Sequence, residues 1–175
     1  MNAPVLCHGT LCIVGPPGSG KTTIGRAVAT LSCAAFHTID DWAGVAYPPS
    51  ARSTPMTNAQ VDQAMSMLFG AVAQSSAIIE FAHHDYMALL NQKRFPLFTT
   101  SRKVIVLADI ETCIARNAAR RSPVSANYVE RAWLSARQLI DSYAVQSSGH
   151  ALVVDTTATS ISTAVAMVAR FFNQE

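Results

Sequence analysis

A glycine-rich stretch near the N-terminus has the residue types and the spacing that bind phosphate groups. The pattern G-x-x-x-x-G-K-[ST] is filled at every fixed position, and its residues are Gly15, Pro16, Pro17, Gly18, Ser19, Gly20, Lys21 and Thr22. Glycines let the backbone curl so that successive N–H groups point at phosphate oxygens, and a following helix adds partial positive charge at its N-terminus. We expect Lys21 to reach the terminal phosphates, Thr22 to ligate Mg²⁺ and Thr23 to line the same site. A tight Gly/Pro turn with a chance lysine is the alternative, and the complete pattern disfavours it.

Acidic side chains follow two apolar runs of strand length. Asp40 and Asp41 end one run, and Glu80 ends another. An unpaired carboxylate is costly to bury, so these groups should lie at the mouth of a site. Phosphoryl transfer to a hydroxyl needs one carboxylate near the acceptor and another that holds magnesium or its waters, so Asp40 and Glu80 are expected to serve the metal with Thr22. An acidic pair at a helix N-terminus and a structural ion pair of Glu80 are the alternatives.

Basic residues concentrate in the second half of the chain, where nine of the thirteen Lys and Arg residues lie between positions 93 and 137. Arg116 and Arg120 are four residues apart and therefore share one face of the helix predicted over 111–121. The guanidinium group stays charged and offers a planar fork to phosphate oxygens, so we expect both side chains to clamp the transferring phosphoryl group. A solvated basic helix, with Glu111 as an ion-pair partner, is the alternative.

Aromatic and polar side chains near the acidic residues could bind an acceptor molecule. The candidates are Asp40, Trp42, Glu80, His83, His84 and Tyr86. A metal site at the two histidines would need a third ligand at suitable spacing, and the sequence offers none. Contacts to acceptor hydroxyls and plain loop histidines are equally open, and most aromatic residues are simply core.

The elements that must position these residues alternate along the chain. Apolar runs of strand length cover 10–14, 35–39, 77–81, 103–108 and 151–154, and helical periodicity covers 21–32, 57–74, 86–91, 111–121, 128–144 and 161–172. This alternation predicts an α/β fold of three layers, α/β/α, with a five-stranded parallel sheet. Ligands of such sheets lie beyond the carboxyl ends of the strands, where the glycine-rich stretch and the acidic residues both fall.

Composition limits the class of protein. A chain of 175 residues, 50% hydrophobic and 14% charged, has the length and the core of a single globular domain over 1–175. A net charge of +2 is too small for a general polyanion binder, so no nucleic-acid partner is expected. The four cysteines show no metal-binding spacing, and no apolar run has the length of a membrane span or the flanks of a secretion signal. We therefore expect a cytoplasmic protein without a membrane partner, as a monomer or homodimer.

The order of these motifs resembles that of the uridine kinase and nicotinamide riboside kinase group. The shared features are the phosphate loop (P-loop), an Asp-Asp-aromatic strand end at 40–42 and an Ile-Ile-Glu strand end at 78–80. Looser similarity extends to shikimate kinases, chloramphenicol phosphotransferase and nucleoside monophosphate kinases. The resemblance implies a P-loop NTPase fold, ATP and Mg²⁺ as cofactors, and a small-molecule hydroxyl as acceptor. It gives Asp40 the role of the base that faces the acceptor, with Asp41 as the substitute, and Glu80 a role in holding magnesium or its water.

Two further roles follow from the resemblance. The run of arginines resembles the start of the lid in nucleotide and nucleoside kinases, which implies a lid over about 116–137, kept short by the break at 122–125. Asp155 and Thr156 follow the last predicted strand, at the place where related kinases pass near the adenine. Capping of that loop is the alternative role of these two residues.

Departures from the family patterns leave the acceptor open. Phe81 stands where a small glycine follows the carboxylate in the resembled group, and the Asp-x-Asp of shikimate kinases is absent. The favoured hypothesis is an ATP-dependent phosphotransferase with an alcohol group as acceptor, either nucleoside-like or a specialised metabolite.

Two other classes of nucleotide-binding protein compete with this hypothesis. A GTPase-type switch is one, because residues 41–44 match D-x-x-G, but the sequence has no Asn-Lys-x-Asp guanine reader. A nucleotide-dependent regulatory NTPase is the other, although the chain is short for the helical subdomain that such motors add.

Overall fold

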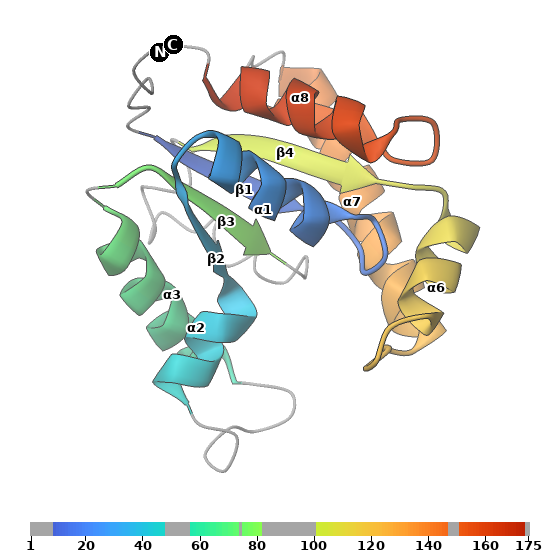
Figure 1. The fold of residues 1–175 in the computed structure, drawn as a ribbon. Helices are drawn as coiled ribbons and strands as arrows, with labels where there is room; N and C mark the ends of the chain where they lie inside the picture. The colour runs from blue at the N-terminus through green and yellow to red at the C-terminus, as the bar shows by residue number, and fades with distance from the viewer. Residues whose placement is uncertain (1–8, 48–56, 74, 82–100, 147–150, 174–175) are drawn as a thin grey trace.

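Five parallel strands form one sheet in the computed structural model, which describes residues 9–47, 57–73, 75–81, 101–146 and 151–173. The strands are β1 (Thr10–Val14), β2 (Ala35–Thr38), β3 (Ala77–Phe81), β4 (Arg102–Leu107) and β5 (Ala151–Asp155). Their spatial order is β2-β3-β1-β4-β5, and every neighbouring pair is parallel (Figure 1). All five predicted strands are confirmed, each to within one residue at its ends.

Helices cover both faces of this sheet. They are α1 (Lys21–Leu31), α2 (Ile39–Ala46), α3 (Asn58–Val72), α6 (Ile110–Ala118), α7 (Ala126–Gln146) and α8 (Ile161–Phe172). Helices α1 and α8 pack together over one face, and α3 and α7 cover the other (Figure 1). The predicted three-layer α/β/α fold is therefore confirmed. Within the described ranges, no helix combines the length and the apolar character that crossing a membrane requires.

The central strands supply an apolar cluster to each face by alternation. In β1, Leu11 and Ile13 belong to the cluster under α1 and α8, whereas Cys12 and Val14 belong to the cluster under α3 and α7. Strands buried on both faces need apolar residues at every position. This requirement explains why β1 forms an unbroken apolar run that could be recognised from the sequence.

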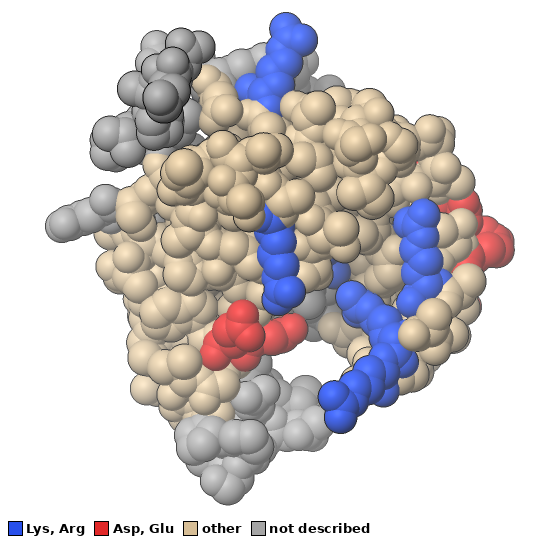
Figure 2. Space-filling model, in the orientation of Figure 1, with Lys and Arg blue, Asp and Glu red and all other residues tan. Residues whose placement is uncertain are grey.

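The carboxyl ends of the strands open on a hollow between α2 and α6. Figure 2 shows Asp and Glu side chains at the α2 rim of this hollow and Lys and Arg side chains at the opposite rim. Ligands of open parallel sheets bind at this edge. The fold therefore brings the acidic and basic residues of the sequence to two sides of one opening.

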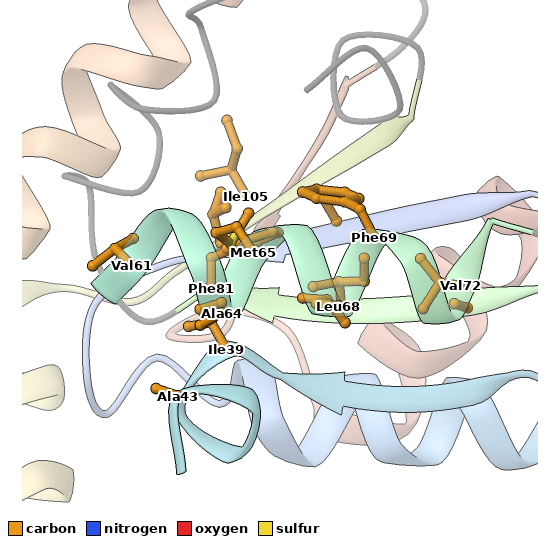
Figure 3. Close-up of a cluster of buried hydrophobic side chains, with 14 of the residues drawn as sticks. Ile39, Ala43, Val61, Ala64, Met65, Leu68, Phe69, Val72, Phe81 and Ile105 are labelled. Atoms are coloured by element: carbon orange, nitrogen blue, oxygen red, sulfur yellow. The ribbon is translucent and has the colours of Figure 1, made fainter. Parts of the chain in front are cut away.

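Helix α3 packs one apolar face onto the sheet beside α2. Its buried residues recur at the spacing of a single helical face, and they are Val61, Ala64, Met65, Leu68, Phe69 and Val72. Figure 3 shows them gathered with Ile39 and Ala43 of α2, Phe81 of β3 and Ile105 of β4. This shared cluster fixes α2 against the end of β3.

Helix α2 is an element that the sequence analysis did not predict. The apolar run predicts a strand through Ile39, but β2 ends at Thr38 and Ile39 begins the helix. The Thr38 hydroxyl accepts a hydrogen bond from the Asp41 amide at 3.0 Å and thereby caps the helix. Asp40 and Asp41 stand in the first turn, where the helix dipole favours negative charge. The acidic pair therefore does lie at a helix N-terminus, with Thr38 as the cap.

The predicted bounds of two other helices also differ from the structure. Helix α6 ends at Ala118 and not at 121, so Arg120 lies beyond it in the connection to α7. Helix α7 begins at Ala126, two residues before its predicted start, and buries Val129 and Ala136 in the core. The helix predicted over 86–91 lies outside the described residues.

Candidate active site

The P-loop joins β1 to α1 and approaches α6 through its backbone. Gly18 and Gly20 have φ angles of 85° and 92°, a left-handed conformation that glycine adopts without steric cost. A Cβ on Gly18 would lie 2.2 Å from the carbonyl oxygen of Cys113, so only glycine permits this close contact with α6. The loop therefore surrounds the N-terminus of α1, whose free amides can bind an anion.

Lys21, Thr22 and Glu80 form a polar cluster under the loop. Lys21 Nζ lies 3.5 Å from Glu80 Oε1 and donates to the Pro16 carbonyl oxygen at 3.4 Å. Thr22 Oγ1 donates to the same Glu80 oxygen at 2.8 Å. Burial lowers the pKa of Lys21, and the charge of Glu80 opposes that shift. Because Lys21 and Glu80 are only 3% and 6% exposed, each is the main neutralising partner of the other.

The donor set of this cluster fits a magnesium ion. The Thr22 hydroxyl donates its hydrogen bond to Glu80, which leaves lone pairs of the hydroxyl oxygen available to a cation. Glu80 Oε2 is buried and has no hydrogen-bond partner among the described residues, as expected of an acceptor that serves an ion or its water. Magnesium keeps several waters and needs few protein ligands. It therefore does not require a cluster of three or more His, Cys, Asp or Glu, and the described part of the chain contains none.

Asp40 and Asp41 act on different partners, although both side chains are exposed. Burial lowers the pKa of Lys21, and the charge of Asp40, like that of Glu80, raises it. The pKa of His37 is lowered by burial, and the charge of Asp41 opposes that shift. Asp40 therefore lies within electrostatic reach of the P-loop lysine, whereas Asp41 acts on a histidine of β2.

Trp42, a predicted acceptor-binding residue, is held by His37. The indole Nε1 donates to His37 Nδ1 at 3.3 Å, and the two ring centroids are 5.8 Å apart. Trp42 also packs against the apolar cluster under α3. Its side chain is half-buried and therefore has part of its surface in the core. The predicted contacts His83, His84 and Tyr86 lie outside the described residues.

The two predicted clamp arginines have separate environments. Arg116 donates to the Thr156 hydroxyl and to the Thr156 carbonyl oxygen, both at 3.2 Å. Arg120 is exposed, and its charge contributes to the lowered pKa of Lys21 after burial, which is the main cause. The shared helix face that the sequence predicted is not formed, because α6 ends between the two residues. Arg120 consequently lies within electrostatic reach of Lys21, and Arg116 is bound to the loop after β5.

The loop after β5 is attached to the P-loop through Thr156. The Thr156 hydroxyl donates to the Ser19 carbonyl oxygen at 2.8 Å, and its amide donates to the Leu107 carbonyl oxygen at 2.7 Å. Asp155 accepts from the Thr157 amide at 2.8 Å, which is the loop-capping role given above as its alternative. Arg116, Thr156 and Ser19 thus form a continuous chain of contacts from α6 to the P-loop.

Two residues with well-defined contacts near the site were missed in the sequence analysis. His37 binds Trp42, and the charge of Asp41 acts on its pKa. The only local signal was its place directly before Thr38, which caps the helix that carries Asp40 and Asp41. Asn117 is 3% exposed and bridges the connection between α6 and α7. The sequence feature that could have indicated Asn117 is a polar residue inside the helix predicted over 111–121, shortly before the Ser-Pro turn at 122–123.

Several solved kinase structures share this fold. The chain is similar to a gluconokinase from Sinorhizobium meliloti 1021, with a TM-score of 0.66, 14% identity, and coverage of 96% of this chain and 93% of that chain. It is similar to a shikimate kinase from Bacteroides thetaiotaomicron, with a TM-score of 0.62, 14% identity, and coverage of 95% and 99%. A sugar kinase from Janibacter sp. HTCC2649 matches with a TM-score of 0.62, 18% identity, and coverage of 94% of each chain. Similarity at these identities establishes the fold alone.

Sequence comparisons place the chain in a family. Comparison with curated proteins gives no match. A family model described as the ATPase family associated with various cellular activities (AAA) matches residues 11–171, which include β1 from its second residue, the complete P-loop and the strands β2 to β5. With a P-loop NTPase domain matched over nearly its whole length, the chain belongs to the ATPase family associated with various cellular activities.

Proposed function

We propose that this protein is a kinase that transfers the γ-phosphate of ATP·Mg²⁺ to a hydroxyl group of a small metabolite. The observation that carries the proposal is the buried cluster of Lys21, Thr22 and Glu80, with the charge of Asp40 in reach of Lys21. Phosphoryl transfer to an alcohol needs a phosphate-binding cation, a metal site and a carboxylate base at one place. The kinases named above add support, because this chain covers 93% to 99% of their length.

The P-loop cluster binds the phosphates in this proposal. Bound ATP·Mg²⁺ supplies the phosphoryl group and the positive charge that neutralises its oxygens. Lys21 would exchange its contact with Glu80 for the terminal phosphates. Thr22 would offer an oxygen lone pair to the ion while its hydroxyl hydrogen stays in the hydrogen bond to Glu80, and the unpartnered Oε2 of Glu80 would be available to the water shell of the ion.

Asp40 is the base that takes the proton from the acceptor hydroxyl. Its side chain is exposed, so an acceptor can reach it, and its charge acts on Lys21 at the phosphate site. The charge of Asp41 acts instead on the pKa of His37, and the Asp41 amide donates to the Thr38 hydroxyl that caps α2. The hydroxyl proton would therefore move to Asp40 as the new oxygen–phosphorus bond forms and the bond from the γ-phosphorus to the bridging oxygen breaks, so that ADP leaves.

The arginines divide between the two ends of the nucleotide. Arg120 is exposed and acts electrostatically on Lys21, so we assign it to the charge of the transferring phosphoryl group. Arg116 is bound to Thr156, and with Asp155 nearby we assign it to the adenine end of the site. In this proposal the exposed residues 118–125, within the segment from 116 to 137, act as a short lid that limits the access of water.

The acceptor is proposed to be nucleoside-like or a specialised metabolite. This proposal rests on the motif order of the uridine kinase and nicotinamide riboside kinase group, in which an Asp-Asp-aromatic strand end precedes an Ile-Ile-Glu strand end. The proposed aromatic and polar partners of the acceptor are Trp42, His83, His84 and Tyr86.

A regulatory ATPase is the second candidate, because the matched family is described as an ATPase family. In that case the γ-phosphate would pass to water, and no small-molecule acceptor would be required. The two candidates differ in what they predict for ADP release. A kinase releases ADP faster when its acceptor is present, whereas an ATPase releases ADP at a rate that does not depend on any acceptor.

A coupled ADP-release screen against nucleosides, sugars, amino acids, shikimate-like acids and hydroxylated antibiotics tests the proposal. We expect one class of acceptor to accelerate ADP release and to become phosphorylated, and the Lys21→Ala variant to lose both signals. ADP release that no acceptor accelerates, together with free phosphate as the product, would favour the ATPase instead.

A further inference from the structure

We propose that Asn117 is a positioning residue that holds Arg120 in the direction of the P-loop lysine. The inference builds on the proposed phosphoryl transfer, and it concerns a residue to which neither the sequence motifs nor the family match gives a role. Asn117 lies in the last turn of α6, one residue before its end at Ala118, and Arg120 lies in the connection that follows.

The side chain of Asn117 closes this connection from both sides. Its Nδ2 donates to the Val124 carbonyl oxygen at 2.8 Å, and its Oδ1 accepts from the Val124 amide at 3.4 Å. Its own carbonyl oxygen accepts from the Arg120 amide at 3.1 Å. The three bonds tie the two ends of the connection together and fix the backbone of Arg120 between them.

The burial of Asn117 is unusual for such a connection. The side chain is 3% exposed, whereas residues 118–125 around it are all exposed. A buried amide is costly unless its donor and its acceptor are both used, and here both are used. An amide that satisfies a loop in this way specifies one loop conformation, which the apolar contacts of an exposed turn could not do.

Helices α6 and α7, which this connection joins, do not need the hydrogen bonds of Asn117 to stay together. Ala108, Cys113 and Val129 form a small buried cluster between α6 and α7, and Trp133 Nε1 donates to the Ala108 carbonyl oxygen at 2.8 Å. These contacts already hold the two helices together. The hydrogen bonds of Asn117 therefore act on the connection between the two helices, where Arg120 lies.

Contacts on α6 link this connection to the phosphate site. Cys113 touches the backbone of Gly18 in the P-loop, and Asn117 follows one turn later on the same buried face of α6. Burial is the main cause of the lowered pKa of Lys21, the charge of Glu80 opposes it, and the charge of Arg120, at the end of this path, adds to the lowering. A prepositioned guanidinium loses less conformational freedom when it binds a phosphoryl group. The hydrogen bonds of Asn117 should therefore raise the rate of phosphoryl transfer.

A double-mutant cycle tests the inference. We expect Asn117→Ala to lower kcat by roughly tenfold to a hundredfold, while the KM for ATP changes little. We expect Arg120→Ala to lower kcat further, and the double variant to equal Arg120→Ala alone, because Asn117 acts only through that side chain. Asn117→Gln keeps both the donor and the acceptor of the amide on a longer side chain and should fall between wild type and Asn117→Ala.

Two control variants separate positioning from general stability. Trp133→Phe removes the hydrogen bond from the indole to the Ala108 carbonyl oxygen. It should lower the unfolding temperature with little loss of kcat. Arg121→Ala removes the neighbouring exposed charge and should cost less than Arg120→Ala. If Asn117→Ala does not fold, the cycle is run with Asn117→Gln, whose loss of kcat must again vanish in the Arg120→Ala background.

Additive losses in the double variant, or an unchanged kcat in a folded Asn117 variant, would overturn the positioning role. The cycle can be followed through ADP release with any phosphoryl acceptor, water included. Failure of the kinase proposal would appear in the wild type, as ADP release without acceptor dependence. The two failures are therefore distinguishable.

Discussion

At the scale of single residues, the two neighbouring carboxylates of α2 differ in what they act on. The charge of Asp40 opposes the effect of burial on the pKa of Lys21, and the charge of Asp41 does the same for His37. Side chains adjacent on a helix point about a hundred degrees apart, so adjacent residues can serve different partners. A base must approach the proposed phosphate site, and the charge of Asp40 acts on Lys21 at that site.

We expect Asp40→Asn to lower kcat at least about a hundredfold, because the acceptor would lose its base. The affinity for ATP should stay within about twofold of wild type, since Lys21, Thr22 and Glu80 are untouched. Asp41→Asn is the matched control and should keep most of its kcat. Steady-state kinetics and equilibrium titration with nucleotide measure the two quantities. A larger loss in Asp41→Asn than in Asp40→Asn would exchange the two roles.

At the scale of secondary-structure elements, a histidine of β2 anchors the helix that carries both carboxylates. His37 Nδ1 accepts the indole proton of Trp42, which requires Nδ1 to be unprotonated. Burial lowers the pKa of His37 from its ordinary value of 6.5, and Asp41 opposes the shift. The attachment of α2 should therefore depend on pH.

The sign of this dependence follows from the lowered pKa. The unfolded chain takes up the proton more readily than the folded chain, so the contribution of His37 to stability is complete above pH 6.5 and is lost as pH falls through the folded-state pKa. We expect the unfolding temperature of wild type to fall more between about pH 7.5 and about pH 5 than that of His37→Asn, whose Oδ1 can accept from Trp42 without titrating. Parallel curves for the two proteins would contradict the assignment to His37.

The end of α1 contains a left-handed residue that is not glycine. Cys33 has a φ angle of 50° and is exposed, and the Ala34 amide donates to the Ala29 carbonyl oxygen at 3.0 Å, as in a Schellman motif. A Cβ in this conformation is strained, so Cys33→Gly should raise the free energy of unfolding by roughly 0.5–1 kcal/mol. Chemical denaturation measures the change. Cys33→Ala, which keeps the Cβ, is the control, and an equal gain in that variant would rule out backbone strain as the cause.

Elements with a strong local signal were predictable, and partnerships between distant residues were not. The strands are buried on both faces in the centre of the sheet, so their apolar runs are long enough to recognise, and the P-loop is a contiguous pattern. Helix α2 was missed because Ile39 continues the apolar run of β2 and the capping residue Thr38 lies inside that run. The contacts Arg116–Thr156 and Asn117–Val124 depend on where the chain returns, which no local pattern encodes.

At the scale of the whole molecule, the proposed nucleotide site is assembled from loops that the sheet brings to one edge. The P-loop follows β1, the cluster partner Glu80 ends β3, and the Thr156 loop follows β5. These segments are far apart in the chain and meet only in the folded state. A ligand that contacts all of them binds the folded protein and not the unfolded chain, and it must therefore raise the stability of the fold as a unit.

We expect ATP with Mg²⁺ to raise the unfolding temperature, because a ligand at about a hundred times its Kd adds about 2.7 kcal/mol to the free energy of unfolding. Chelation of the metal with EDTA should shrink the shift, since Thr22 and the free oxygen of Glu80 would lose the ion that joins them to the phosphates. Lys21→Ala should show little shift in either condition. A shift of the same size with and without the metal would remove the ion from the site, and a full shift in Lys21→Ala would mean that ATP binds away from the P-loop.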